Sequence, residues 1–264
     1  MVSPLALPEP DEEHLTQSPL KLVVCQVRHS RTVAVSDAGR ILEVQGCLGD
    51  SYPEALPFEQ HEVVFEVGPE GGNVGKSQSQ QGWQLKSDDA AWTVTLQTDF
   101  LSIETSAYVD WVDFRDRYSR VLDCVADIYA PKLEQRVGLR YVDVIERADL
   151  QVAHDWRGLI SDTVLGLASD TEIGPSVRLS HQIVEMEAPE HMRVLLRHGC
   201  ERMADGQGTA YQLDHDCYRQ QTRGFETSVI LATMDDLHRL ALQVFQHAVT
   251  PKLYAELKGG VATS

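Results

Sequence analysis

The chain of 264 residues contains 40 acidic and 23 basic side chains, which gives a formal net charge of −17 with histidine neutral. Its hydrophobic fraction of 42% and charged fraction of 24% are typical of a globular protein, and they exclude a disordered chain, a collagen-like repeat and a disulfide scaffold. The acidic excess argues against a nonspecific nucleic-acid binder and against a binder of anionic membranes, because both need surplus positive charge.

Residues 1–18 combine prolines with acidic side chains and predict a flexible acidic tail. They lack the basic start and the apolar run of a secretory signal, and no stretch of the chain approaches the roughly 20 apolar residues of a membrane-spanning helix. The five cysteines are scattered and odd in number, which is typical of reduced thiols. We therefore expect a soluble cytoplasmic protein that contacts no membrane.

Short runs of branched apolar residues predict the first strands, starting after Pro19. A stretch rich in Gly, Ser and Gln, Gly68–Gly82, predicts a surface loop between strands. The strands predicted in this part of the chain are Leu20–Val27, Thr32–Val35, Glu62–Val67, Gln84–Lys86 and Ala91–Thr98.

A long amphipathic helix is predicted over Tyr108–Tyr129, where apolar residues recur at spacings of three and four. Ser106 is the expected N-cap, and Pro131 cannot continue the helix. Acidic residues lie largely on the opposite side of this helix, and we interpret them as a surface that faces a partner. These residues are Asp110, Asp113, Asp116, Asp123 and Asp127.

The second part of the chain repeats this alternation of strands and helices. A strand is predicted around Arg136–Ile145, a shorter helix over Asp155–Ala168, and two or three strands within Val177–Cys217, with a hairpin turn at Ala204–Gly208. A last helix is expected from about Met234, with Thr233 and Asp236 as a capping box and Pro251 ending or restarting it.

Segregated runs of strands and helices favour the α+β class, with antiparallel sheets and two long amphipathic helices. We predict one domain over residues 19–258 and a flexible C-terminus over 259–264. Each part of the domain has a meander followed by a long helix, so it could consist of two similar α+β halves, 19–146 and 147–258.

The segment Glu70–Ser77 resembles a phosphate-binding loop in its closing Gly75-Lys76-Ser77. Glu70 occupies the position of the first glycine and would point a carboxylate at the phosphates. The residues that follow do not predict a helix, so the helix N-terminus that should hold the anion is missing. We expect no nucleotide site and no cofactor.

Two His-x-Cys pairs offer the ligand types that zinc prefers, and they lie on the two arms of one predicted hairpin. Depending on the hairpin register, the pairs point to opposite faces of the sheet or to the same face. Because the usual Cys-x-x-Cys spacing is absent, we favour ordinary strand residues over a metal site. The four residues are His198, Cys200, His215 and Cys217.

Arg136 and Arg140 share one face of their predicted strand, about 13 Å apart at roughly 3.3 Å per residue. Together they could receive an extended anion or an acidic partner. Pairing with the surplus carboxylates of the chain itself is the favoured alternative. No signature of a catalytic nucleophile, zinc protease or kinase occurs, so we predict no catalytic residue.

The stretch Arg136–Asp143, taken with Tyr108-x-x-Trp111-x-x-Phe114, resembles a sporadically distributed prokaryotic family of uncharacterised proteins of about 260 residues. The resemblance covers roughly residues 18–256. This chain has Leu22 where the family usually has Glu, and Asp143 where it usually has Asn. The family implies no activity, and its patchy distribution is typical of accessory genes such as mobile or defence loci.

These observations favour a non-enzymatic protein-binding, regulatory or adaptor protein, within a prokaryotic defence system or another accessory multi-protein system. The expected partner is a protein with a basic or amphipathic surface, without direct nucleic-acid binding; in one variant, the acidic surface mimics nucleic acid. The alternative is a hydrolase or nuclease with a site assembled from dispersed Asp, Glu and His. Such an enzyme needs a bound metal or a pocket of converging carboxylates with perturbed pKa values.

Overall fold

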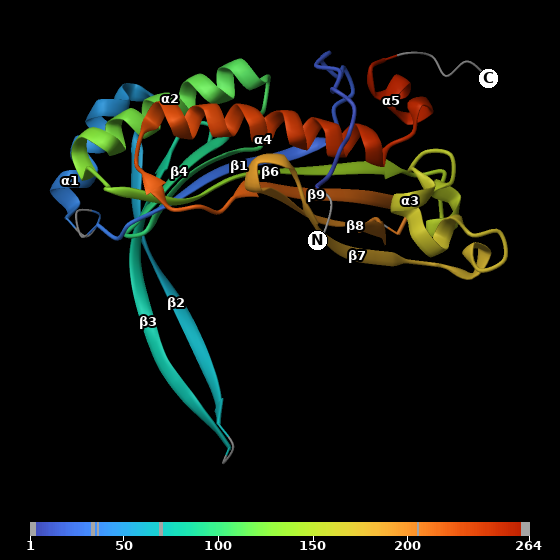
Figure 1. The fold of residues 1–264 in the computed structure, drawn as a ribbon, viewed down its shortest axis with the longest axis horizontal. Helices are drawn as coiled ribbons and strands as arrows, with labels where there is room; N and C mark the ends of the chain where they lie inside the picture. The colour runs from blue at the N-terminus through green and yellow to red at the C-terminus, as the bar shows by residue number, and fades with distance from the viewer. Residues whose placement is uncertain (1–3, 33–34, 36, 69–70, 205, 260–264) are drawn as a thin grey trace.

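The computed structural model describes residues 4–32, 35, 37–68, 71–204 and 206–259, with the backbone alone described for 60–80. The α+β fold predicted from the sequence is confirmed: one antiparallel sheet is covered on one face by helices (Figure 1). The strands in the described part of the chain are β1 (Leu20–His29), β2 (Glu54–Gly68), β3 (Gly71–Lys86), β4 (Trp92–Gln97), β5 (Phe100–Thr105), β6 (Leu133–Arg147), β7 (Ser180–Glu187), β8 (Met192–Arg202), β9 (Thr209–Arg219) and β10 (Arg223–Gly224).

The strands follow the order β2-β3-β4-β5-β1-β6-β9-β8-β7, and β10 pairs with β6. Two long helices lie next to each other over the sheet, while the β2–β3 hairpin projects away on the other side as an arm (Figure 1). The helices are α1 (Ala38–Leu48), α2 (Trp111–Tyr129), α3 (Asp162–Leu165), α4 (Thr227–Ala248) and α5 (Pro251–Leu257), joined by short 3-10 turns.

The core lies between the sheet and the apolar stripes of α2 and α4. Residues of odd number on β1 and β6, such as Val23, Cys25 and Leu139, are buried on this side, because side chains alternate along a strand. Phe114 of α2 and Leu237 of α4 cover them from above. Between the register shifts near the strand ends, even-numbered residues of β1 and β6 point to the open face, which makes the two faces chemically different.

The chain runs twice through the same sequence of elements. Residues 20–129 form a strand, a helix, a meander and the long helix α2, and residues 133–248 form a strand, short helical turns, a meander and α4. The last strand of each meander pairs with the first strand of its unit, and β1 pairs with β6 at the centre of the sheet. The division between these units falls at residues 130–132, before β6.

Several predicted elements differ from the structure in the first unit. The predicted loop Gly68–Gly82 is wrong for the described residues from Gly71 onwards, because their backbone pairs with β2 as strand β3. Residues 33 and 34 of the predicted strand Thr32–Val35 lie outside the described residues, and helix α1 follows, capped by the Asp37 side chain. Helix α2 starts at Trp111, and its N-cap is Asp110 instead of Ser106.

The second unit departs from the prediction in its helices. The predicted helix Asp155–Ala168 is broken into short turns and the single turn α3. Helix α4 begins at Thr227, about two turns before the predicted start, because its buried stripe already begins at Ile230. Thr233 therefore lies inside the helix, where its Oγ1 donates to the Val229 carbonyl at 2.9 Å. A separate short helix, α5, begins at Pro251.

The expectation of reduced thiols is wrong for Cys47 and Cys124, which form a disulfide between α1 and α2. The other three cysteines are free and buried. In the described part of the chain, we find no helix that is both long and apolar enough to cross a membrane. Residues 4–18, predicted as a flexible tail, contact the folded domain, and Asp11 and Gln246 of α4 exchange two hydrogen bonds of 2.9 and 2.6 Å.

Candidate functional site

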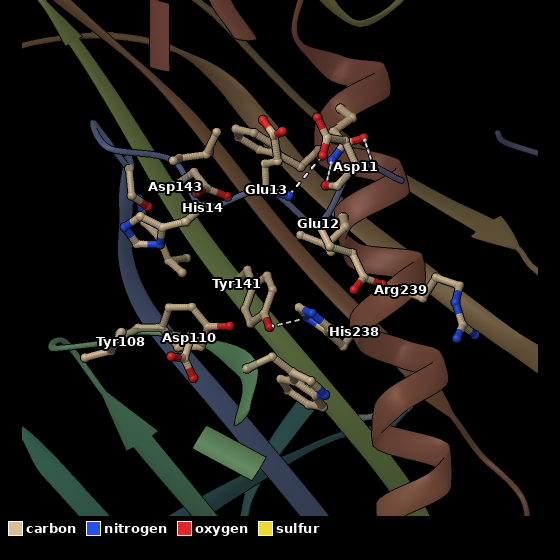
Figure 2. A pocket seen from close by; sticks show the side chains of 18 of the residues that line it. Asp11, Glu12, Glu13, His14, Tyr108, Asp110, Tyr141, Asp143, His238 and Arg239 are labelled. Atoms are coloured by element: carbon tan, nitrogen blue, oxygen red, sulfur yellow. Dashed lines mark hydrogen bonds between the residues drawn. The ribbon is translucent and has the colours of Figure 1, made fainter. Parts of the chain in front are cut away.

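A cavity of about 610 Å³ lies between the sheet, the start of α2 and α4 (Figure 2). Its floor comes from β6 and β9, its walls from the two long helices, and residues 11–15 of the N-terminal segment contribute to its rim. The side chains of Tyr141 and Asp143, from β6, and of His238, from α4, converge on it. This volume is within the range of typical small-molecule sites.

Asp143 reaches the floor through strand alternation. It lies two residues after Tyr141 on β6, so both side chains point to the helix-covered face. The Asp143 side chain is buried, with 4% of the residue exposed, and the described residues offer its carboxyl no hydrogen bond. Burial alone raises the pKa of Asp143 from 3.8 to about 8. At pH 7 this carboxyl therefore keeps its proton.

His215 of β9 lies beside Asp143 on the same floor. It is fully buried, and neither of its ring nitrogens has a hydrogen-bond partner in the part of the chain that the structure describes. Its Nδ1 is 3.9 Å from Oδ2 of Asp143, which is too long for a hydrogen bond. Burial lowers the pKa of His215 from 6.5 to about 4. Both groups are thus neutral between about pH 4 and pH 8, so their contact is not an ion pair.

His238 of α4 forms one wall. Its Nδ1 shares a hydrogen bond of 2.8 Å with the Tyr141 hydroxyl, and its ring stacks on Trp111 at 4.2 Å between centroids. Burial lowers the pKa of His238 to about 4 and raises the pKa of Tyr141 well above 10. The Tyr141–His238 pair is therefore neutral at physiological pH.

A polar clamp fixes the start of α2 against α4. Asp235 of α4 accepts hydrogen bonds from Trp111 Nε1 at 3.0 Å and from Arg115 at 2.8 and 3.1 Å. Asp110, whose side chain also lines the cavity, caps α2 by accepting from the Asp113 amide at 2.8 Å. These bonds hold the aromatic wall in place, which preorganises the cavity.

Ion pairs and a hydrogen bond hold the N-terminal segment at the rim against α4 and the end of α5. Lys258 pairs with Asp11 at 2.8 Å and with Glu13, and the Gln243 side chain donates to the Pro8 carbonyl at 3.0 Å. These contacts lie at the surface, where ion pairs contribute little individually. The segment is thus held next to the cavity by weak, exposed interactions.

Arg136 and Arg140 lie on the opposite, open face of the sheet. Arg136 pairs with Asp216 at 2.7 Å and lies over the Tyr218 ring, and Arg140 forms two hydrogen bonds of 2.7 Å with Asp214. A side chain at position 138 would collide with the Arg136 guanidinium, which explains the glycine of the motif. Both arginines thus engage carboxylates of the chain itself.

The four candidate metal ligands do not converge. The observed register pairs Arg202 with Thr209, which places both His-x-Cys pairs on the same face. His198, however, hydrogen-bonds to the Tyr211 hydroxyl at 3.0 Å, and Cys200 and Cys217 are buried separately. No group of three or more possible ligands occurs among the residues that the structure describes. Of the four, only His215 lines the cavity.

The predicted acidic surface of α2 is divided between roles. Asp110 caps the helix, and Asp113 pairs with Arg117 at 3.0 Å. Asp116, Asp123 and Asp127 are exposed. In the segment that resembles a phosphate-binding loop, Glu70 lies outside the described residues, and the backbone from Gly71 onwards is a strand rather than a loop before a helix.

The sequence patterns do not reveal the cavity, and of the residues on its floor they indicated only His215, as a weak metal-ligand candidate. One signal was available for Asp143, because it interrupts a buried alternation that continues through Leu139, Tyr141 and Ile145. An acidic residue at such a position is either paired or functional. The contribution of His238 had no local signal, since it depends on how α4 crosses β6.

No family model matches the chain, and no curated protein is similar to it. The resemblance to the sporadic prokaryotic family therefore stays a prediction. Among solved structures, the chain is weakly similar to the di-domain ARO/CYC StfQ from the steffimycin biosynthetic pathway, with 11% identity, a TM-score of 0.20, and coverage of 90% of this chain and 96% of that one. A similarity at this level carries no argument about fold or function.

Proposed function

We propose that this chain is a non-enzymatic binding protein that holds a small organic ligand in the central cavity and acts as a regulatory or adaptor component. The observation that carries this proposal is a pair of buried polar side chains on the cavity floor: among the described residues, the His215 ring nitrogens have no hydrogen-bond partner, and the Asp143 carboxyl accepts no hydrogen bond. A buried polar group without a partner costs about 1–3 kcal/mol. A ligand that supplies donors and acceptors at this floor would recover that cost.

A cavity-filling substitution tests the proposal. Leu242 lines the cavity from α4, so Leu242→Trp should fill it, whereas Leu42→Trp adds the same bulk at an exposed position of α1. Small molecules extracted from protein purified from its native host are identified by mass spectrometry. We expect a ligand with the wild type and with Leu42→Trp, and none with Leu242→Trp. Equal recovery from all three proteins would contradict the proposal.

The proposal includes a protein partner, as expected from the acidic charge. Asp116, Asp123 and Asp127 form an exposed acidic stripe on α2, and a basic or amphipathic surface would complement it. The resemblance to the sporadic family supports a place in a prokaryotic defence or accessory system. Co-purification from the native host at low and high salt is the test, because an electrostatic complex should weaken as salt rises.

A hydrolase is the second candidate, favoured by the Tyr141–His238 hydrogen bond next to a carboxyl that keeps its proton at pH 7. Such a carboxyl could protonate a leaving group. A nuclease is less well supported, because the acidic lining repels phosphates. Hydrolysis of p-nitrophenyl esters by the wild type, lost in Asp143→Asn, would replace the binding proposal with this one.

A cytoplasmic location also stays a proposal. The disulfide between Cys47 and Cys124 argues against it, because disulfides persist in oxidising compartments. Thiol labelling in freshly lysed native cells decides the question. Five labelled cysteines after denaturation would support the cytoplasm, and three would support an oxidising compartment.

A further inference from the structure

We infer that the ligand of the cavity is a small organic ammonium ion with a planar apolar body, whose charge is held by the Asp143 carboxylate. This inference rests on the proposed function, since it names the class of ligand for the same cavity. Three observations carry it: the charge of the lining, the aromatic walls, and the unpartnered carboxyl on the floor.

The lining is acidic. Its carboxyl groups are those of Asp11, Glu12, Glu13, Asp110, Asp143 and Asp235, whereas its single arginine among the described lining residues is Arg239. Arg239 contacts Asp236 at 3.3 Å and Glu9 at 3.9 Å, neither of which lines the cavity.

Two cations next to the lining offset part of this charge: Lys258 pairs with Asp11 and Glu13, and Arg115 pairs with Asp235. Asp143 and Glu12 have no such cation among the described residues. The cavity therefore disfavours an anion and favours a cation.

The walls are aromatic. Tyr108, Trp111 and Tyr141 surround the floor, and Phe245 and Tyr254 line the cavity from α4 and α5. The rings of Tyr108 and Tyr141 are 6.0 Å apart between centroids, so they form one continuous wall. Aromatic faces attract a cation through their quadrupole and pack against a planar apolar group. This combination suits an amine attached to a ring better than a compact inorganic cation.

The floor provides a specific anchor. Asp143 is buried and lines the cavity, and no described side chain donates a hydrogen bond to it (Figure 2). An ammonium group at this place would supply both the missing hydrogen bond and the countercharge. Its positive charge would lower the pKa of Asp143 towards the usual range, so that the carboxyl releases its proton to solvent as the cation binds.

Three probes with the same indole ring and two-carbon chain separate the charge classes: tryptamine is cationic, tryptophol is neutral, and indole-3-propionate is anionic. Their affinities for the full-length protein are measured by isothermal titration calorimetry at pH 7. We expect tryptamine to bind at least about tenfold more tightly than tryptophol, and indole-3-propionate to bind most weakly. Asp143→Asn should abolish this preference for tryptamine.

Asp116→Asn is the matched control, because it makes the same Asp-to-Asn replacement at an exposed position on the outside of α2. It should leave all three affinities within twofold of the wild type. Thermal melts confirm that each variant is folded.

A second measurement is the release of a proton when tryptamine binds. Binding of tryptamine near pH 7 should release a proton, measured as a heat that changes with the ionisation enthalpy of the buffer. Other titratable groups face the same cavity: His215 from β9, His238 from α4, Tyr108 and Asp110 before α2, and Glu13 and His14 at the rim. The assignment to Asp143 therefore requires that Asp143→Asn, and not His14→Gln, removes the release.

Equal or tighter binding of tryptophol or indole-3-propionate would overturn the inference while the proposed binding function stands. Absence of binding by all three probes would also overturn the inference. The proposed binding function is then tested separately, by whether a ligand is extracted from the wild type and not from Leu242→Trp. An effect of Asp116→Asn equal to that of Asp143→Asn would show a nonspecific charge effect and reject the anchor.

Discussion

Asp143 and Asp214 are two buried aspartates on adjacent strands, with 4% and 2% of their surface exposed, yet their surroundings are opposite. Asp214 points to the open face, where Arg140 bonds it twice at 2.7 Å and Arg197 lies 3.6 Å away. Asp143 points to the helix-covered face, where no described residue donates a hydrogen bond to it. Burial alone therefore does not single out a candidate functional carboxyl, whereas burial inside a cavity without a hydrogen bond from the described residues does.

The same comparison explains the motif Arg136–Asp143. Its even positions include Arg136 and Arg140, which form ion pairs on the open face, and Gly138, which leaves room for the Arg136 guanidinium. Its odd positions include Tyr141 and Asp143, which line the cavity. One strand thus carries a structural network on one side and the candidate binding site on the other.

The largest expected effect comes from Asp143→Asn. Folding raises the pKa of Asp143 from 3.8 to about 8, so the unfolded chain releases this proton first as pH rises, and the folded state loses stability between about pH 4 and pH 8. At about 1.36 kcal/mol per unit, this carboxyl lowers the free energy of unfolding by about 5 kcal/mol across that window. Urea unfolding at pH 5 and pH 9 should show a much smaller pH dependence in the variant; parallel profiles would contradict the comparison.

Asp214→Asn should act in the opposite direction. It removes the charged acceptor of Arg140, and a hydrogen bond to a charged group contributes about 1.5–3 kcal/mol. Because the Arg140 side chain is 42% exposed and can be hydrated, we expect a loss of about 2 kcal/mol at pH 7. Urea unfolding measures this loss, and tryptamine binding should be unchanged. A stabilised variant would mean that burial of Asp214, like that of Asp143, costs more than its contacts recover.

His215→Leu tests the neighbour of Asp143. The pKa of His215 is lowered from 6.5 to about 4, so the unfolded chain binds a proton more readily and stability is lost as pH falls through this window. Between pH 7 and pH 5, protonation of His215 in the unfolded chain should lower the free energy of unfolding of the wild type by up to about 2 kcal/mol. The variant should not show this part of the loss. Urea unfolding at both values checks this; a variant with the same acid sensitivity as wild type would show that His215 is solvated.

The smallest effect on stability is expected for the exposed acids of α2. Replacing Asp116, Asp123 and Asp127 together with Asn should change the free energy of unfolding by less than about 0.5 kcal/mol per site, because exposed positions are tolerant. Thermal melts measure this. Loss of partner co-purification with unchanged stability would assign the stripe to binding, whereas retained co-purification would place the partner elsewhere.

Sequence patterns predicted the fold class and the amphipathic helices α2 and α4, because local periodicity of apolar residues encodes them. They missed β5 and α1 and assigned a loop to the start of β3, where glycine, serine and glutamine carry little strand signal. The start of α4 was misplaced by seven residues, since Thr233 looks like a cap but lies inside a longer buried stripe.

For the site, the sequence alone placed Asp143 and His215 on strands, but it did not predict that they lie next to each other on the floor of a cavity. The acidic excess predicted that Arg136 and Arg140 pair with carboxylates of the chain itself. Which aspartate pairs with which arginine depends on the β6–β9 register. The cavity could not be found, because it requires α2, α4 and the N-terminal segment, which are more than 90 residues apart in the chain.

By itself, the sequence determined the alternation along each strand, and therefore that Arg140 and Asp143 point to opposite faces. It also determined the acidic charge and the amphipathic stripes. Only the tertiary structure decided that two arginines reach Asp214 while Asp143 faces a cavity lined by aromatic side chains. The physical reason is that a pKa, an ion pair and a pocket depend on distances between segments remote in sequence, which are set by how α4 packs across the sheet.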